Sequence, residues 1–377
     1  MSITHAQPTP HTKKRRGLKP GPAFLCVGSL HGNEPAGTLA IQRVLERIDR
    51  DGPLDRGDLF TLIGNPEAIA LKQRYVDRDL NRLWNDRRVA RLRHHGPNTV
   101  EGGLTLAIAD LIDEVTLEAR GDRYLLDLHT TSGDSPPFSN AVDRLESRRI
   151  ALRLQAPTVL GIEEQLDGTL VDWLDRRGFV GTVFESGQHE DPGSVDRAEA
   201  AIWLSLEALG MIEPSSPLAP AVQGALGLLT RAAQGLPRMV ELIYRHALDD
   251  RTAFDMLPGF SSFQAVSEGQ LLAHEMENPV HSPADGRLLM PLYQPQGDEG
   301  FFLVRDYGAA QRLASQILRR AGFIQLATAL PGVSRARGRP GVLVLEPSAR
   351  RGDVRNFLRL LGFRRERVER GAILLSR

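Results

Sequence analysis

The chain has 377 residues, of which 41% are hydrophobic and 25% are charged, so a wholly disordered chain is excluded and a sizeable core is available. Its 47 basic and 47 acidic residues cancel, but unevenly: residues 1–20 carry +5, residues 21–300 carry 26 − 42 = −16, and residues 301–377 carry 16 − 5 = +11. The single cysteine, Cys26, excludes an intrachain disulfide, and no apolar run reaches the roughly 18 residues of a membrane span.

The first 21 residues are polar and contain prolines, which predicts a disordered basic arm over residues 1–21. This arm contains basic residues, but no apolar segment follows them, so it lacks the pattern of a secretory signal. We therefore expect a cytoplasmic protein without a membrane partner.

Residues 22–213 alternate short apolar runs with stretches in which apolar residues recur every three or four positions. The expected strands are AFLCVGS, DLFTLIGNP, YLLDLH, TVLGI and GTVFESG, and the expected helices follow HGNEP or cover residues 102–118, 139–155 and 195–209. Strands that alternate with helices predict an α/β sandwich with a mostly parallel central sheet. In such sheets, ligands bind beyond the carboxyl ends of the strands.

The Ser/Pro cluster EPSSPLAP, at residues 213–220, indicates a boundary. Residues 214–305 are expected to form a small β-rich domain, because short alternating runs and tight turns follow one another there. Residues 306–377 contain two amphipathic helices, AQRLASQILRRAGF and DVRNFLRLLGF, and the strand-like runs VLVLE and AILLS frame the second helix. This pattern predicts an Arg-rich α/β appendage.

Candidate metal ligands follow two of the expected strands. His31 and Glu34 stand three residues apart at the start of a helix, and His129 ends the strand YLLDLH. Two histidines and one glutamate are a ligand set of catalytic zinc, in which the fourth position stays open for water. Asp127 lies two residues before His129, so it points to the same side of the strand and can orient an imidazole. A surface ion pair and a structural histidine are the alternative interpretations.

The motifs GSLHGNEPAG, NPEAIALKQRYVDRDLNRLW, LLDLHTT and FESGQH occur in this order. Together they resemble the succinylglutamate desuccinylase/aspartoacylase family, part of the zinc carboxypeptidase-like clan, over roughly residues 21–305. The resemblance implies a zinc-carboxypeptidase-like α/β/α sandwich, with residues 22–213 as the zinc-hydrolase domain. It also implies one Zn²⁺ per chain, bound by His31, Glu34 and His129.

The same resemblance implies roles for residues in the other motifs. Glu185 is the implied carboxylate that activates the zinc-bound water, and Arg74 the residue that polarises the substrate carbonyl. Asn81 and Arg82 are the implied pair that binds a substrate carboxylate. These roles agree with the chemistry, because Zn²⁺ lowers the pKa of bound water to about 7 and the planar fork of arginine binds carboxylates bidentately.

Other polar residues near these motifs are expected to support the site. Asp79 is expected to hold its loop through backbone hydrogen bonds, whereas His189 either lines the site or stabilises a loop. Between His129 and Glu185, no arginine can be assigned to a second substrate carboxylate. A dicarboxylic acyl group, such as succinyl or aspartyl, is therefore not expected.

The leading functional hypothesis is a zinc-dependent amidohydrolase that removes the acyl group from an N-acyl amino acid or a similar small amide. A carboxypeptidase-type peptidase is the alternative enzyme. A third hypothesis is a binding protein whose basic tail docks RNA or an acidic partner, but that tail lacks interleaved aromatic residues, which disfavours nucleic acid. The sequence leaves the acyl group, the amino acid and a homo-oligomeric state open.

Overall fold

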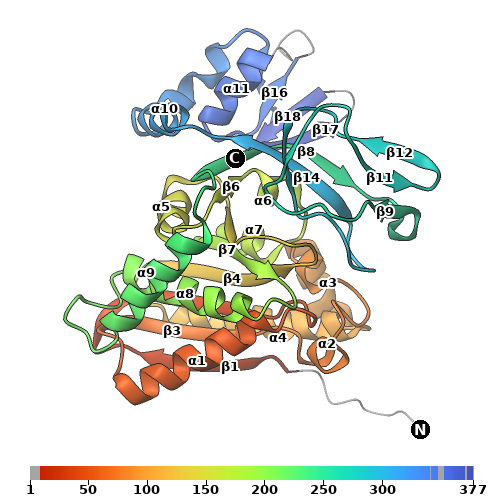
Figure 1. Cartoon of the computed structure of the whole chain (residues 1–377). Helices are drawn as coiled ribbons and strands as arrows, with labels where there is room; N and C mark the ends of the chain where they lie inside the picture. The colour runs from red at the N-terminus through yellow and green to blue at the C-terminus, as the bar shows by residue number, and fades with distance from the viewer. Residues whose placement is uncertain (1–8, 340, 347–351, 370–371, 377) are drawn as a thin grey trace.

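The computed structural model describes residues 9–339, 341–346, 352–369 and 372–376. An 11-stranded sheet with the order β1-β3-β2-β4-β7-β5-β6-β8-β14-β13-β10 runs through the molecule (Figure 1). Its strands are β1 (His11–Arg16), β2 (Lys19–Gly28), β3 (Arg56–Ile63), β4 (Arg123–Thr131), β5 (Phe138–Ala141), β6 (Thr158–Leu160), β7 (Phe179–Gln188), β8 (Met239–Ala247), β10 (Ala265–Val266), β13 (Gly286–Leu289) and β14 (Glu299–Asp306). The neighbours β3, β2, β4 and β7 pair in parallel, which confirms the expected α/β class.

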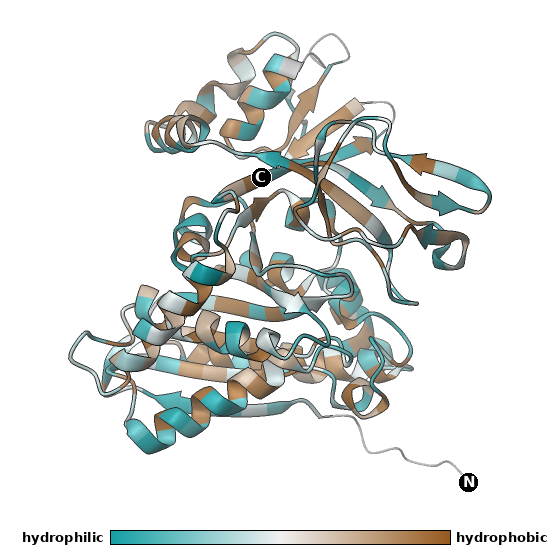
Figure 2. Ribbon diagram, viewed as in Figure 1, coloured by the Kyte–Doolittle hydropathy of each residue, from teal (hydrophilic) through white to brown (hydrophobic). Residues whose placement is uncertain are grey.

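Helices cover both faces of this parallel centre. The helices α1 (Ala36–Asp51), α8 (Gly193–Ala208) and α9 (Ala219–Ala232) share one core, and α4 (Val100–Glu118) and α7 (Leu170–Asp175) share the other. Strand β2 contributes to both, because successive side chains of a strand point to opposite faces: Phe24 and Cys26 enter the first core, Leu25 and Val27 the second. The strands accordingly form a hydrophobic layer between helices with hydrophilic outer faces (Figure 2).

Short elements fill the segments between these strands. They are α2 (Pro66–Leu71), η1 (Leu80–Arg82), α3 (Asp86–His95), α5 (Leu145–Arg153) and α6 (Ile162–Gln165). The helix expected over residues 139–155 is shorter than predicted, because its first residues form β5, which pairs antiparallel with β7 and parallel with β6. None of the described helices is both long enough and apolar enough to cross a membrane.

The predicted disordered arm over residues 1–21 is wrong where the structure describes it. Strand β1 pairs antiparallel with β3 along the edge of the sheet, and β2 begins at Lys19. The basic side chains of β1 have acidic partners on neighbouring helices: Arg15 Nε donates to Asp49 at 2.6 Å, and Lys14 contacts Glu118. The pairing depends on β3, a strand more than 40 residues away, which local composition does not reveal. Residues 1–8 lie outside the described residues.

The expected boundary at residues 213/214 also needs correction. The Ser/Pro cluster leads into α9, which has a proline in its first turn and packs in the core shared with α1 and α8. The β-rich part begins after that helix, and its strands β8 and β14 extend the large sheet beyond β6. A separate 3-stranded sheet is formed by β9 (Phe254–Met256), β11 (Leu271–Glu275) and β12 (Asn278–His281), after the turn η2 (Arg251–Ala253).

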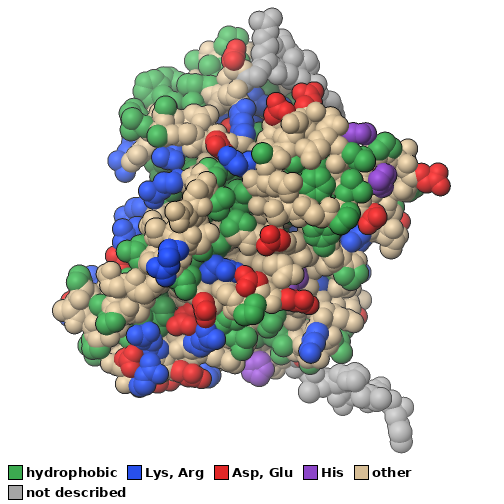
Figure 3. Space-filling model, in the orientation of Figure 1, with side chains coloured by type: hydrophobic (Ala, Val, Ile, Leu, Met, Phe, Trp, Pro, Cys, Tyr) green, Lys and Arg blue, Asp and Glu red, His purple; other side chains and the backbone are tan. Residues whose placement is uncertain are grey.

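The tail forms the expected α/β appendage. A 4-stranded sheet, β15-β16-β18-β17, packs with both predicted amphipathic helices around a core of its own. Its elements are α10 (Ala309–Arg320), η3 (Phe323–Ala329), β15 (Val333–Arg335), β16 (Leu343–Leu345), α11 (Gly352–Leu360), β17 (Arg365–Glu369) and β18 (Ala372–Ser376). Arg319 and Arg364 of this tail are buried against the larger body. On the face in Figure 3, basic and acidic side chains lie interspersed rather than in separate regions.

Candidate metal centre and substrate pocket

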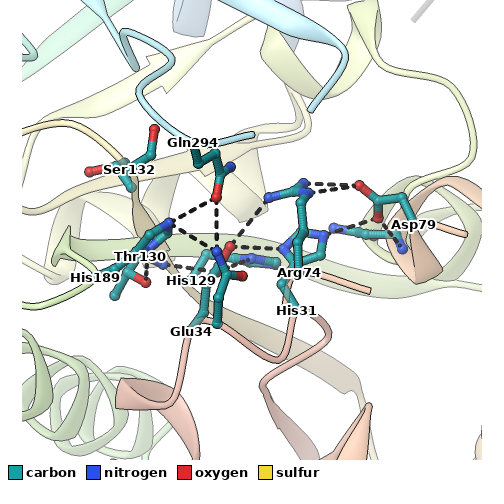
Figure 4. A network of polar contacts seen from close by, with 12 residues as sticks. His31, Glu34, Arg74, Asp79, His129, Thr130, Ser132, His189 and Gln294 are labelled. Carbon is teal, nitrogen blue, oxygen red and sulfur yellow. Dashed lines mark hydrogen bonds and ion pairs between the residues drawn. The ribbon is translucent and has the colours of Figure 1, made fainter. Parts of the chain in front are cut away.

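Three potential metal ligands converge at the carboxyl ends of β2 and β4. His31 follows β2, Glu34 precedes α1, and His129 lies on β4, which neighbours β2 in the sheet. Glu34 stands between the imidazoles (Figure 4): its Oε1 lies 2.9 Å from Nδ1 of His31, and its Oε2 lies 2.9 Å from Nδ1 of His129. All three side chains are buried, and their candidate ligand atoms lie within 4.8 Å of one another.

The far nitrogen of each imidazole faces another carboxylate. Nε2 of His31 lies 3.0 Å from Oδ1 of Asp79, and Nε2 of His129 lies 3.1 Å from Oδ2 of Asp127. The second contact lacks the geometry of a hydrogen bond. A carboxylate behind a histidine fixes its ring and is typical of histidines that bind metal through the other nitrogen. The donor set and its surroundings therefore fit a Zn²⁺ ion.

The ionisation of Glu34 agrees with this arrangement. Burial alone would raise the pKa of Glu34, but the imidazoles of His31 and His129 hold it well below its usual range. Burial would likewise raise the pKa of Asp79, and the guanidinium of Arg74 lowers it well below the usual range. Both carboxylates are thus available in the charged form that binds cations.

Glu185 lies beside the candidate ligands, at the carboxyl end of β7. It stands opposite His129 in the parallel register of β4 and β7, and it is 5% exposed. Its Oε2 has no hydrogen-bond partner among the described residues. Burial raises the pKa of Glu185 to about 8, against the attraction of His129. The structure thus brings the predicted catalytic carboxylate next to the candidate metal ligands.

Arg74 follows α2 and points toward the same centre (Figure 4). Its Nε and Nη2 donate to Oδ2 of Asp79 at 3.1 and 3.0 Å, and its Nη1 reaches Oε1 of Glu34 at 3.4 Å. Asp79 also accepts a hydrogen bond from the backbone of Asn81. It holds its loop as expected, and in addition it links Arg74 to His31, which the sequence did not reveal.

Asn81 and Arg82 lie on η1 and line the pocket. Oδ1 of Asn81 accepts a hydrogen bond from the backbone N–H of Leu170 at 2.8 Å. Nη2 of Arg82 donates to Oε2 of Glu299 at 3.0 Å, and Glu299 also accepts from Arg245 at 3.0 Å. A substrate carboxylate at Arg82 would therefore compete with, or lie beside, a carboxylate of the protein itself.

The loop that carries these arginines is fixed by Glu101 of α4. This fully buried carboxylate accepts hydrogen bonds from the backbone N–H groups of Val76, Asp77 and Arg78 and from the side chain of Asn65. Sequence reasoning missed this residue, because a glutamate in the first turn of a helix is ordinarily a surface residue whose negative charge interacts favourably with the helix dipole.

His189 stabilises the rim of the site. Its Nδ1 lies 2.7 Å from Oγ1 of Thr130, and its Nε2 lies 3.2 Å from Oε1 of Gln294. Nδ2 of Asn33 donates to the same Gln294 oxygen at 2.8 Å (Figure 4). Because both ring nitrogens are engaged, the geometry favours the loop-stabilising interpretation of His189.

A cavity of about 90 Å³ opens over the candidate metal ligands. Besides these ligands, its walls include Arg74, Asn81, Arg82, Asn140, Ile162, Glu163, Leu166, Thr169, Val183, Glu185, Met290, Leu292, Gln294, Glu299 and Phe302. The structure thus brings the predicted residues together in one pocket, except Asp127, which lies behind His129. Glu163, Gln294 and Glu299 were not predicted.

Comparisons with known proteins agree in one family. Residues 20–171 match the succinylglutamate desuccinylase/aspartoacylase catalytic domain. A succinylglutamate desuccinylase of Pseudomonas syringae pv. tomato is 37% identical over 286 residues, which cover 72% of this chain and 79% of that protein. A second, from Pseudomonas fluorescens, is 30% identical over 138 residues, and this match spans 35% of this chain and only 39% of that protein.

Solved structures show the same fold. A succinylglutamate desuccinylase/aspartoacylase from Rhodobacter sphaeroides superposes with a TM-score of 0.56 at 21% identity, and the match covers 78% of this chain and 88% of that one. A succinylglutamate desuccinylase from Chromobacterium violaceum gives a TM-score of 0.53 at 20% identity, over 77% and 85% of the two chains. At these identities the likeness establishes the architecture alone.

Proposed function

Because this chain belongs to the succinylglutamate desuccinylase/aspartoacylase family, we propose that it is a zinc-dependent hydrolase that cleaves the amide bond of an N-acyl amino acid or a similar small amide. The observation that carries the proposal is the convergence of His31, Glu34 and His129 beside the unpaired carboxyl of Glu185. These four residues combine a zinc ligand set with a proton acceptor in one buried pocket.

His31, Glu34 and His129 would hold the metal, through the atoms that now face one another. When bound, Zn²⁺ supplies a Lewis acid that acidifies water and polarises a carbonyl. Asp79 and Asp127 keep the two imidazole rings in place from behind. The protein therefore needs no large rearrangement to form the metal site.

Glu185 is the proposed general base and acid. Its carboxyl group accepts a proton from the attacking water and later returns it to the nitrogen of the leaving amine. This role follows from its place opposite His129 in the sheet and from the oxygen that no described residue engages. An amide is otherwise a poor substrate at neutral pH, because its nitrogen leaves only after it has been protonated.

Arg74 and Arg82 supply positive charge for the substrate. Arg74 is held rigidly by Asp79, so its guanidinium is placed to stabilise the oxyanion that develops on the carbonyl oxygen. Arg82, with Asn81, is placed at the pocket wall to bind the carboxylate of the amino acid. Glu299 keeps Arg82 oriented before the substrate arrives.

The experiment combines metal analysis with one substitution. Purified protein is expected to bind about one zinc per chain, and Glu185→Gln is expected to retain zinc while hydrolysis of N-acyl amino acids falls by about 10²- to 10⁴-fold. Glu190→Gln, an exposed neighbour on the loop after β7, is the matched control and should behave like the wild type. Full activity in the Glu185 variant, or efficient cleavage of dipeptides but not of N-acyl amino acids, would contradict the proposal.

A further inference from the structure

Glu163 of α6 has an open oxygen in the pocket wall. Its side chain lines the cavity and is 4% exposed. Oε2 accepts a hydrogen bond from Oγ1 of Thr169 at 3.2 Å, whereas no described residue donates to Oε1. Oε1 is not among the fully buried polar atoms that lack a partner, so it is open to the cavity and can accept a hydrogen bond from a bound molecule. The substrate is the group that enters this cavity.

No cation is among the described groups that act most strongly on Glu163. The charged groups that act on it most strongly are the carboxylates Glu164, Asp127 and Asp172, and burial together with Glu164 raises the pKa of Glu163 to about 7. The arginines that line the pocket, Arg74 and Arg82, are paired with other carboxylates. This wall of the pocket therefore offers a carboxyl group that lacks a cationic partner, and a cation bound there would favour its charged form.

The residues that follow Glu163 in α6 are held by neighbouring parts of the chain, and Thr169 holds its carboxylate. Oε1 of Glu164 accepts a hydrogen bond from the backbone N–H of Asp143 at 2.7 Å. Gln165 donates through its side chain to the carbonyl oxygen of Arg364 at 3.1 Å, and its own carbonyl accepts from Arg245 at 2.8 Å. Three contacts to different elements thus keep the short helix α6 in position.

We propose that Glu163 determines substrate specificity by binding a positively charged amino group of the substrate, while Arg82 binds the substrate carboxylate. The preferred substrate of the proposed deacylase then carries both charges, and the inference rests on that proposed function for its kinetic test. A side-chain carboxylate in the same place, as in glutamate, would meet Glu163, and the arginines of the pocket are already paired with other carboxylates. The inference therefore concerns the side chain of the amino acid and not its acyl group.

The test compares Nα-acetyl-ornithine with Nα-acetyl-norleucine and Nα-acetyl-glutamate. Ornithine and norleucine have side chains of similar length and differ in the terminal ammonium, and glutamate presents a carboxylate instead. We expect kcat/KM of the zinc-loaded wild type to be about 10- to 100-fold higher for the ornithine derivative than for the norleucine derivative, which corresponds to one charged hydrogen bond. The glutamate derivative should be the poorest of the three.

Glu163→Gln keeps the size of the side chain and an acceptor for Thr169 but removes the charge. In this variant the ratio between the ornithine and norleucine derivatives is expected to fall below about 3-fold. Glu190→Gln is again the control: this exposed glutamate on the loop after β7 lies outside the pocket lining, so the wild-type ratio should persist. A wild-type ratio near one, an unchanged ratio in Glu163→Gln, or a preference for the glutamate derivative would overturn the inference.

Calorimetric titration with the same three compounds separates the two proposals. If no compound is hydrolysed, the deacylase proposal fails, and the ratio of the dissociation constants alone decides the role of Glu163. Tighter binding of the ornithine derivative that depends on Glu163 would still support the subsite. Equal binding of all three compounds would overturn it.

Discussion

Asp143, at the contact between the tail and the larger body, offers the sharpest test of how the two are joined. Its side chain is 1% exposed and accepts hydrogen bonds from Nε of Arg148 at 2.6 Å, from Nη2 of Arg319 at 2.9 Å and from Nε of Arg364. Burial alone would raise the pKa of Asp143, but these guanidinium groups lower it well below the usual range. Asp143→Asn removes the charge that three buried arginines share.

The expected cost follows from what each arginine retains. Removing one partner of a buried ion pair costs about 3–5 kcal/mol. The lower end applies here, because each arginine keeps at least one further acceptor. These are Oγ of Ser315 for Arg148 at 3.1 Å, the backbone oxygen of Asp143 for Arg319 at 2.8 Å, and Oε2 of Glu241 for Arg364 at 2.8 Å. A loss of about 3 kcal/mol changes the unfolding equilibrium by roughly 150-fold.

The pH dependence has a definite sign. A carboxylate whose folded pKa is lowered contributes stability above its unfolded pKa of about 3.9 and loses it as the pH falls through the folded pKa. The free energy of unfolding of Asp143→Asn should therefore lie about 3 kcal/mol below the wild type at pH 7, and the gap should narrow below about pH 4.

Urea denaturation is the assay for this prediction. All three tryptophans lie before residue 204, so their fluorescence reports the larger body, whereas circular dichroism also reports the tail. Asp196→Asn is the control, because Asp196 forms an exposed ion pair with Arg43 at 2.7 Å and exposed pairs contribute little. If Asp143→Asn and Asp196→Asn shift the midpoint equally, the buried cluster does not join tail and body as the structure indicates.

Three further predictions concern single residues. Burial raises the pKa of the Cys26 thiol, so a thiol reagent should label it only at the rate of unfolding, and rapid labelling of the native protein would refute this. Glu101→Gln replaces an acceptor of three backbone N–H groups by an amide that partly donates, and we expect kcat/KM to fall about 10- to 100-fold while zinc content stays unchanged. Arg82→Lys loses the bidentate fork, so KM should rise about 10-fold or more with a smaller change in kcat, and a dominant loss of kcat would contradict its role in binding.

The parts of the fold that the sequence predicts well are those determined by local pattern. The apolar run around Cys26 and the helix that contains Ile41 and Val44 appear where expected, because periodicity records which side chains are buried. The arm around Lys14 and the helix α9 were predicted wrongly. In both cases the element is fixed by packing against other elements: β1 pairs with β3, more than 40 residues away, and α9 packs in the core that α1 and α8 share.

The residues of the site also differ in how well the sequence predicts them. The candidate ligands and the general base lie near the carboxyl ends of strands or just before a helix, so their convergence follows from adjacent parallel strands. They are His31, Glu34, His129 and Glu185. Glu163 lies in IEEQ, which has the composition of an exposed polar turn. Only the packing of α6 against β5 and the tail places it in the pocket wall. Residues that act through tertiary placement leave no local signal.

Part of the contrast between the acidic body and the basic tail is neutralised where the two meet. Arginines of the tail form ion pairs with carboxylates of the body. The pairs are Arg319 with Asp143, Arg364 with Asp143 and Glu241, and Arg365 with Asp172. Deleting residues 306–377 would therefore remove partners of buried carboxylates instead of cleanly separating an appendage.

The same contact reaches the substrate pocket. The carbonyl oxygen of Arg364 accepts a hydrogen bond from Gln165, and the backbone N–H of Asp143 donates a hydrogen bond to Glu164. Glu164 and Gln165 directly follow Glu163 in α6. A loosened tail should then make the position of Glu163 less well defined before it disturbs the metal ligands, which lie between β2 and α1 and on β4. Asp143→Asn is accordingly expected to reduce discrimination between ornithine and norleucine derivatives while zinc content is retained. Loss of zinc without a change in that discrimination would show that the tail supports the metal centre and not the position of Glu163.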